Sequence, residues 1–316
     1  MGRIYGYANL AHEGADAVQS LMGESACLTA ALLWAVAVVL FRAPIAAWGA
    51  RTANLVKCLI GTVLLALTLP FFGGFSTFFF TPGRDLALIA LSGVVGLTIG
   101  DTLLFAAVAR LGAHRTLILQ ASAPVFAGLL AATAGERLSV GQLVGAVVVL
   151  GGVTTVVVSG DRETNGGKNI AIGGIALALL AALGQGAGVV LAKEGLDTLG
   201  ATPATLLRLA AGTGGLLMAA VISRGLGKIR GAFRDGASMR RMVPATFLGT
   251  YLALILMMVG VALAPATVAA VLLATSPIFS LVIEAIADRK RPTILAVLGT
   301  IVTVAGVAIL VGFASF

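Results

Sequence analysis

Ten apolar stretches, each about 20 residues long, follow one another along this chain of 316 residues. A helix needs about 20 apolar residues to cross the hydrocarbon core of a bilayer. Short connections that carry Gly, Pro or charged residues separate the stretches. They lie at about 24–41, 52–70, 86–108, 116–134, 140–158, 171–192, 203–223, 244–263, 266–286 and 294–314. This pattern predicts a membrane protein with ten helical spans.

Composition excludes the water-soluble alternatives. The chain is 59% hydrophobic and 11% charged, whereas soluble domains are about 45–50% apolar and about 25% charged. Soluble enzymes, disordered tails and nucleic-acid-binding domains do not fit these values. The two cysteines, Cys27 and Cys58, allow no disulfide framework and are interpreted as packing residues.

Residues 1–23 are polar and contain no apolar run of the signal-peptide type. We therefore expect a polar N-terminal tail outside the membrane. The first apolar stretch would then serve as the insertion signal.

The chain contains an internal repeat at an offset of about 151–154 residues. The matched positions include Lys57-Gly61-Thr62 with Arg208-Gly212-Thr213, Ser122–Phe126 with Thr275–Phe279, and Gly145 and Gly152 with Gly299 and Gly306. Each copy, 24–158 and 171–314, holds five spans, so the second must enter the membrane inverted. The predicted fold is all-α, with ten transmembrane helices in two inverted five-helix repeats. Inverted repeats build many secondary transporters, although channels and scaffolds can also arise from duplication.

The distribution of basic residues bears on orientation. Of 21 Lys and Arg, fifteen fall on the side opposite the termini, four fall on the side of the termini, and Lys57 and Arg208 lie within spans. Cytoplasmic loops carry the excess of positive charge, so both termini are predicted to lie outside. The basic segment 224–241 is then a cytoplasmic loop, and no nucleic acid is expected as a partner.

The order of several short motifs resembles the EamA family of the drug/metabolite transporter superfamily. These motifs are Gly100-Asp101, Ala121-Ser122-Ala123-Pro124, Gly135–Ser139, Gly145, Gly151-Gly152, Trp34, and Lys57 or Arg208 in the second span of each half. The resemblance implies ten helices around a central cavity and the export or exchange of small metabolites. Two features depart from it: Asp288–Arg291 replaces a Glu-Arg pair, and many members have cytoplasmic termini, opposite to the charge distribution.

Asp101 is the acidic residue that lies deepest in a span. An Asp at the centre of a helix costs about 2.5–3.5 kcal/mol on insertion scales, so such residues usually serve a function. Lys57 enters its span from the same side and can reach a similar depth. One hypothesis is that Asp101 carries a coupling proton or binds a cationic group, with Lys57 as its switchable partner. The alternative is a structural ion pair. Arg208 matches Lys57, but Leu254 stands where Asp101 would, so Arg208 is expected to reach the interface near Glu194 or Asp197.

Pro124 and Pro277 lie inside the fourth and ninth spans at matching repeat positions. A proline within a helix removes one hydrogen bond, which here frees the carbonyls of Gln120 and Leu273. The neighbouring hydroxyls of Ser122, Thr275 and Ser276 can satisfy the freed backbone. These residues predict symmetric kinks that either line a cavity or serve packing alone.

Four further side chains are candidates for substrate contact, namely Trp34, Gln120, Gln185 and Tyr251. A buried Gln is more often a bond between helices than a ligand contact. With two histidines, no Gly-x-Ser-x-Gly motif and no paired carboxylates within spans, the sequence predicts no enzyme, metal site or cofactor.

The predicted function is secondary-active transport of a small metabolite by alternating access. Protons or another coupling ion are the expected energy source, since no ATP-binding motif is present. We expect a monomer or homodimer in the bilayer of a prokaryotic cytoplasmic membrane. The alternatives are a flippase for lipids or lipid-linked substrates on the same scaffold and, with less support, a membrane-embedded enzyme.

Overall fold

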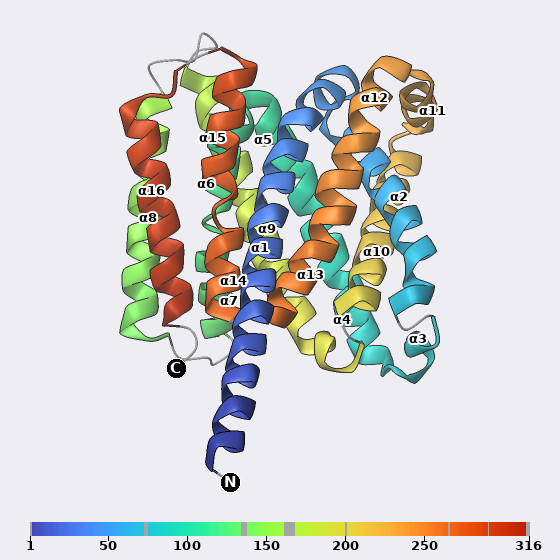
Figure 1. The fold of residues 1–316 in the computed structure, drawn as a ribbon. Helices are drawn as coiled ribbons and strands as arrows, with labels where there is room; N and C mark the ends of the chain where they lie inside the picture. The colour runs from blue at the N-terminus through green and yellow to red at the C-terminus, as the bar shows by residue number, and fades with distance from the viewer. Residues whose placement is uncertain are drawn as a thin grey trace.

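The computed structural model is a bundle of helices with no strand in the described part of the chain (Figure 1). It describes residues 2–72, 75–133, 138–160, 168–199, 201–264, 266–289 and 291–313. Among these residues, nine helical segments are long and apolar enough to cross a membrane, and Val271–Ala287 is a shorter apolar helix. The prediction of an all-helical, multi-pass membrane protein is confirmed.

The first half of the chain supplies five spans, several of them built from more than one helix. They are α1 (Gly2–Trp48), α2 (Ala50–Thr68) with the 3₁₀ turn η1 (Leu69–Phe72), α4 (Gly83–Gly93) with η2 (Val94–Gly100) and α5 (Asp101–Leu111), α6 (Ala113–Gln120) with α7 (Ala123–Thr133), and α8 (Val140–Gly160). The short helix α3 (Thr77–Phe80) lies between the second and third spans.

The second half repeats this order. Its spans are α9 (Lys168–Leu199), α10 (Ala201–Ile222), α12 (Gly236–Ala245) with η3 (Thr246–Leu252) and α13 (Ala253–Leu263), α14 (Ala266–Leu273) with α15 (Ser276–Ala287), and α16 (Ile294–Gly312). The extra helix α11 (Leu226–Arg234) lies between the seventh and eighth spans. Both η2 and η3 are π-helical, and they interrupt the third and eighth spans at matching repeat positions.

Helix α1 is longer at both ends than the predicted span 24–41. It begins at Gly2 and continues through Pro44 to Trp48, and its part Val18–Trp48 is long and apolar enough to span a membrane. The chain turns at Gly49, whose φ of 79° is accessible to glycine at little cost. The connection expected at Arg42–Pro44 is therefore the last part of the helix.

The bundle has two distinct ends (Figure 1). Helix α1 starts and α16 ends at the same end, which we call the terminal end. The opposite end, here the basic end, holds α11 and the start of α12.

At the basic end, Asp235 caps α12 by accepting from the Ser238 amide at 3.1 Å, and it accepts from Trp48 Nε1 at 2.9 Å. The Ser238 hydroxyl and amide, followed by the Trp48 indole, lower the pKa of the half-buried Asp235 carboxyl below its usual value through their hydrogen bonds.

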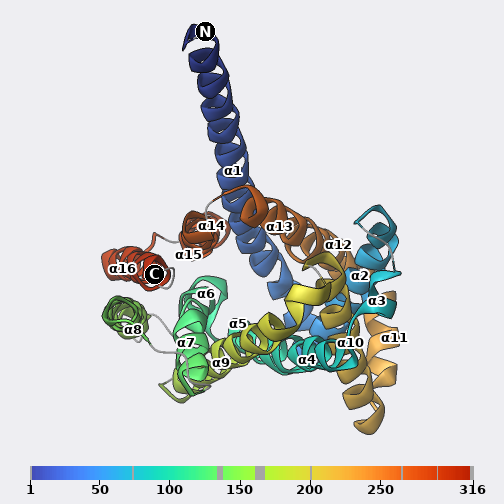
Figure 2. The same ribbon diagram turned by 90° about the horizontal axis from the view of Figure 1, so that it is seen from below.

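Matched positions of the two halves meet in space. The hydroxyls of Thr62 and Thr213, which are repeat counterparts, lie 3.0 Å apart. Helices α8 and α16 pair at one edge of the bundle (Figure 2). A Cβ at Gly152 would lie 2.8 Å from the Gly299 oxygen, and one at Gly299 would lie 2.9 Å from the Gly152 oxygen. Bare glycine therefore lets these two backbones touch.

Candidate functional site

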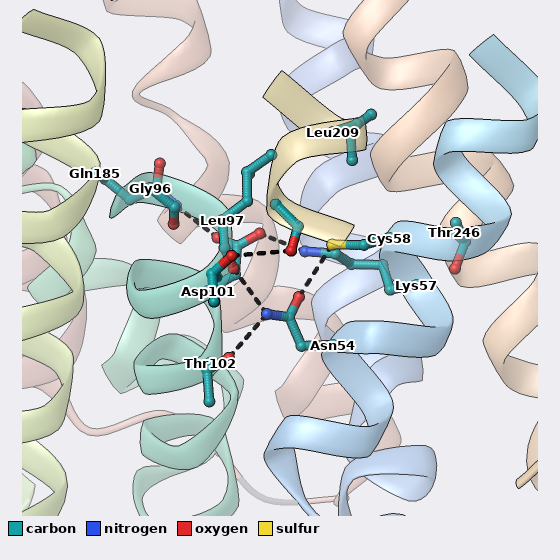
Figure 3. A network of polar contacts seen from close by, with 12 residues as sticks. Asn54, Lys57, Cys58, Gly96, Leu97, Asp101, Thr102, Gln185, Leu209 and Thr246 are labelled. Carbon is teal, nitrogen blue, oxygen red and sulfur yellow. Dashed lines mark hydrogen bonds and ion pairs between the residues drawn. The ribbon is translucent and has the colours of Figure 1, made fainter. Parts of the chain in front are cut away.

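A buried polar network lies in the middle of the bundle (Figure 3). The Lys57 ammonium forms a salt bridge and hydrogen bond with Asp101 Oδ2, and their side chains are 2% and 5% exposed. Gln185 Nε2 donates to the other oxygen, Asp101 Oδ1, at 2.5 Å. The structure thus joins three sequence candidates, and Gln185 belongs to the second half while the other two belong to the first.

The π-helical segment η2 presents Asp101 to these partners. The Asp101 amide bonds to the Gly96 carbonyl five residues earlier, in place of the usual four. The same carbonyl accepts from Gln185 Nε2 at 3.1 Å. The wider turn and the absent side chain at Gly96 let the Gln185 amide reach both the backbone of η2 and the carboxylate that follows it.

Asn54 is a member of this site that the sequence analysis missed. Its amide nitrogen donates to the Leu97 carbonyl at 2.8 Å and to Thr102 Oγ1 at 3.0 Å. These bonds tie α2 to the third span on both sides of Asp101. The available signal was spacing, because Asn54 lies three residues before Lys57 and therefore shares its helix face.

The Lys57 ammonium has an aromatic neighbour in addition to its carboxylate partner. The Lys57 nitrogen also lies 5.1 Å from the centroid of the Phe105 ring, on the helix that carries Asp101. Two charges removed from water are tolerated when they are paired and hydrogen-bonded, and loss of one leaves the other uncompensated. A change in protonation of Asp101 would therefore act directly on the contacts between the second, third and sixth spans.

The repeat counterparts of these residues form a different environment. Trp34, which matches Gln185, packs against Gly249 of η3, where an added Cβ would lie 3.4 Å from its ring. Arg208, which matches Lys57, was expected to reach the interface. Its guanidinium instead lies against η2, with Nη2 3.4 Å from the position of a Cβ at Gly96.

The fourth and ninth spans are interrupted before their prolines. The backbone turns at Ala121–Ser122 and again at Ala274–Thr275. Ser122 Oγ donates to the Leu119 carbonyl at 2.6 Å, and Thr275 Oγ1 donates to the Leu272 carbonyl at 2.5 Å. The carbonyls expected to be free were those of Gln120 and Leu273, one residue later in each span. The acceptors differ by one residue because the helix tightens to i→i−3 bonds at each break. Ser276 and Pro277 then begin α15, as Ala123 and Pro124 begin α7.

The other candidates have separate surroundings. Gln120 Oε1 is buried with no hydrogen-bond partner among the described residues. The Tyr251 ring lies beside that of Phe247, with centroids 5.4 Å apart and the rings tilted by 34°, and it packs against an apolar cluster from α2, η1 and α10. Neither side chain has a hydrogen bond to the Asp101 network within the described part of the chain.

A second polar cluster joins the two halves at the basic end. Glu284 of α15 accepts from the backbone amides of Ala113 and His114, at 2.8 and 2.9 Å, and so caps the N-terminus of α6. Arg42 of α1 bonds both oxygens of Asp288 at 3.1 and 3.0 Å and lies 3.4 Å from Glu284. This cluster borders a pocket of about 300 Å³.

Glu284→Ala is expected to lower the free energy of unfolding by about 0.5–2 kcal/mol, because two amides at the start of α6 lose their cap. Thermal unfolding in detergent measures the change. Asp288→Ala is the matched control: its side chain is 40% exposed, and exposed ion pairs contribute less than about 1 kcal/mol. An equal or larger loss for Asp288→Ala would contradict this assignment.

Comparison with known proteins identifies the family. The model of the EamA-like transporter family matches residues 21–158 and 172–312. No curated protein sequence matches significantly. A solved structure, titled only "Crystal structure of protein", superposes with a TM-score of 0.61 at 17% sequence identity. The match covers 93% of this chain and 96% of the chain in that structure. That likeness concerns the fold alone. The two family matches, one in each half, show that the chain belongs to the EamA-like transporter family of membrane proteins.

Proposed function

We propose that this protein is a secondary-active transporter that moves a small metabolite by alternating access. The observation that supports the proposal is that side chains from both halves of the chain bind the Asp101 carboxylate. One carboxylate oxygen is held by Lys57 of the first repeat, and the other by Gln185 of the second. Transporters built from inverted repeats bind substrate near the midplane and rock one part of the bundle against another.

In this proposal Asp101 carries the coupling proton. The ionised carboxylate holds the second, third and sixth spans together through Lys57 and Gln185. Protonation removes the charge that attracts Lys57 and turns one oxygen from an acceptor into a donor. The contact between the halves then weakens, and the interrupted spans α6–α7 and α14–α15 offer places where the bundle can bend.

We further propose that the basic end faces the cytoplasm of a prokaryotic cell, which places both termini outside. A cysteine introduced near the N-terminus would then react with an impermeant maleimide on intact cells. Reaction only after the membrane is broken would reverse the orientation.

Counterflow in proteoliposomes with a panel of amino acids, amines and nucleosides identifies a substrate, and uptake of that substrate under a proton gradient tests the coupling. Asp101→Asn is expected to reduce proton-driven uptake at least about tenfold, a loss of more than about 1.4 kcal/mol in the barrier. The remaining exchange should no longer depend on pH. Unchanged, pH-dependent uptake by Asp101→Asn would contradict the proposal.

Glu24→Gln is the matched control, because Glu24 accepts from Ser20 near the terminal end and does not contact the network. It should transport like the wild type. Scrambling of a fluorescent phospholipid without any metabolite counterflow would instead support the flippase alternative.

A further inference from the structure

Arg208 is a second cation in the middle of the bundle. It lies seven residues after the start of α10 and is the repeat counterpart of Lys57. Its Nε is buried and has no hydrogen-bond partner among the described residues. A charged side chain inside a membrane protein normally pairs with another charge or with backbone carbonyls. Arg208 is therefore an exception that requires an explanation.

The carboxylate that acts electrostatically on Arg208 is Asp101. Both oxygens of Asp101 are already engaged, one by Lys57 and the other by Gln185. Lys57 and Arg208 thus share one carboxylate in this layer of the described structure, which leaves one positive charge without a counter-ion. The Arg208 side chain is half-buried, and withdrawing part of a charge from water without a partner is costly.

The backbone, rather than an ion pair, fixes Arg208 in place. A Cβ at Gly93 would lie 2.2 Å from the Arg208 carbonyl oxygen, so the third and seventh spans touch here through glycine. One turn further along, a Cβ at Gly96 would lie 3.4 Å from Arg208 Nη2 and 3.7 Å from Gln185 Oε1. The guanidinium and the Gln185 amide therefore face the same bare stretch of η2.

We propose that Arg208 binds the acid group of the transported substrate, so that the substrate is a small organic anion carrying a carboxylate or phosphate. This inference rests on the proposed function and adds the chemical class of the substrate. A guanidinium offers two parallel N–H donors that match either acid group. Binding supplies the missing counter-ion, and the central layer then holds two cations and two anions.

Because Arg208 lacks a counter-ion, the protein without ligand should be less stable than a variant with an uncharged side chain at this position. Arg208→Met removes an uncompensated charge and keeps most of the side-chain volume. We expect it to raise the melting temperature in detergent without added ligand by about 2–4 °C, the shift that corresponds to about 1 kcal/mol in a chain of 150–250 residues. Lys57→Met is the matched control, because it removes the cation that bonds directly to Asp101 and should lower the melting temperature. An unchanged or lower melting temperature for Arg208→Met, or failure to fold, would show a structural role and overturn the proposal.

Ligand probes test the same site directly. Succinate, L-glutamate and glycerol 3-phosphate are compared with uncharged succinamide and with putrescine. At least one anion should raise the melting temperature of the wild type, leave Arg208→Met unchanged and give a smaller shift with Arg208→Lys. Carboxylate and phosphate probes distinguish the two kinds of acid group. Stabilisation by succinamide or putrescine alone, an equal anion response in Arg208→Met, or no response to any anion would contradict an anion site.

Counterflow with the same compounds separates this inference from the proposed function. Exchange of an anion by the wild type that is lost in Arg208→Met supports both. Exchange of putrescine or succinamide alone would leave the transporter intact and overturn the anion site. If no compound shows counterflow, the result counts against the transporter, and the melting-temperature experiments still decide whether Arg208 binds anions.

Discussion

Lys57→Met should be among the most destabilising single substitutions in this protein. It leaves the Asp101 carboxylate, which is 5% exposed, in the bundle without its cation. Removing one partner of a buried ion pair costs about 3–5 kcal/mol. Thermal unfolding in detergent should show a large drop in melting temperature.

A double mutant gives the control. In Lys57→Met with Asp101→Leu both members of the bonded pair are removed together, and an apolar pair of similar volume is often as stable as the ion pair it replaces. Leucine is also the residue that the second repeat has at the matching position, Leu254. Most of the lost stability should therefore return, while proton-coupled transport remains absent. A double mutant as unstable as Lys57→Met would contradict this account.

Gly152→Ala should separate α8 from α16. The added Cβ would lie 2.4 Å from Thr303 Oγ1, 2.5 Å from the Thr303 amide nitrogen and 2.8 Å from the Gly299 oxygen. Two of these atoms belong to the backbone and cannot rotate away. Overpacking of this kind costs about 1–3 kcal/mol, although alanine is otherwise favoured over glycine in a helix by about 1 kcal/mol.

Gly151→Ala is the neighbouring control. No atom lies within 4 Å of a Cβ built there, so the change should be neutral or slightly stabilising. Thermal unfolding of both variants measures the difference. Equal melting temperatures would mean that α8 and α16 can separate without cost, against the close backbone contact seen in the structure.

The sequence was sufficient for the architecture because bilayer thickness sets the length of each apolar stretch. The repeat was equally readable, since matched residues such as Lys57 and Arg208 keep their order. The depth of Lys57 and Asp101 also placed those two side chains near one another. These features depend on spacing along the chain, which sequence records directly.

The details that shape the site were not readable in this way. The π-helical turn before Asp101 arises from a shift from i→i−4 to i→i−5 hydrogen bonds, which no residue type specifies. The interface position expected for Arg208 followed from treating its span in isolation. In the folded protein, Gly93 brings α10 against the third span and directs Arg208 toward η2. The contact of Glu284 with the start of α6 joins residues about 170 positions apart.

The contact between Thr62 and Thr213 has a consequence for symmetry. Each threonine contacts its own repeat counterpart, so the contact lies at the two-fold axis that would relate two identical repeats. Two identical half-length chains related by a two-fold axis there would have to carry two copies of the Lys57–Asp101 pair or none. Because both halves belong to one polypeptide, this protein can place a carboxylate on one side of that point and Leu254 on the other. Joining the halves therefore permits one acidic group to be shared by two cations.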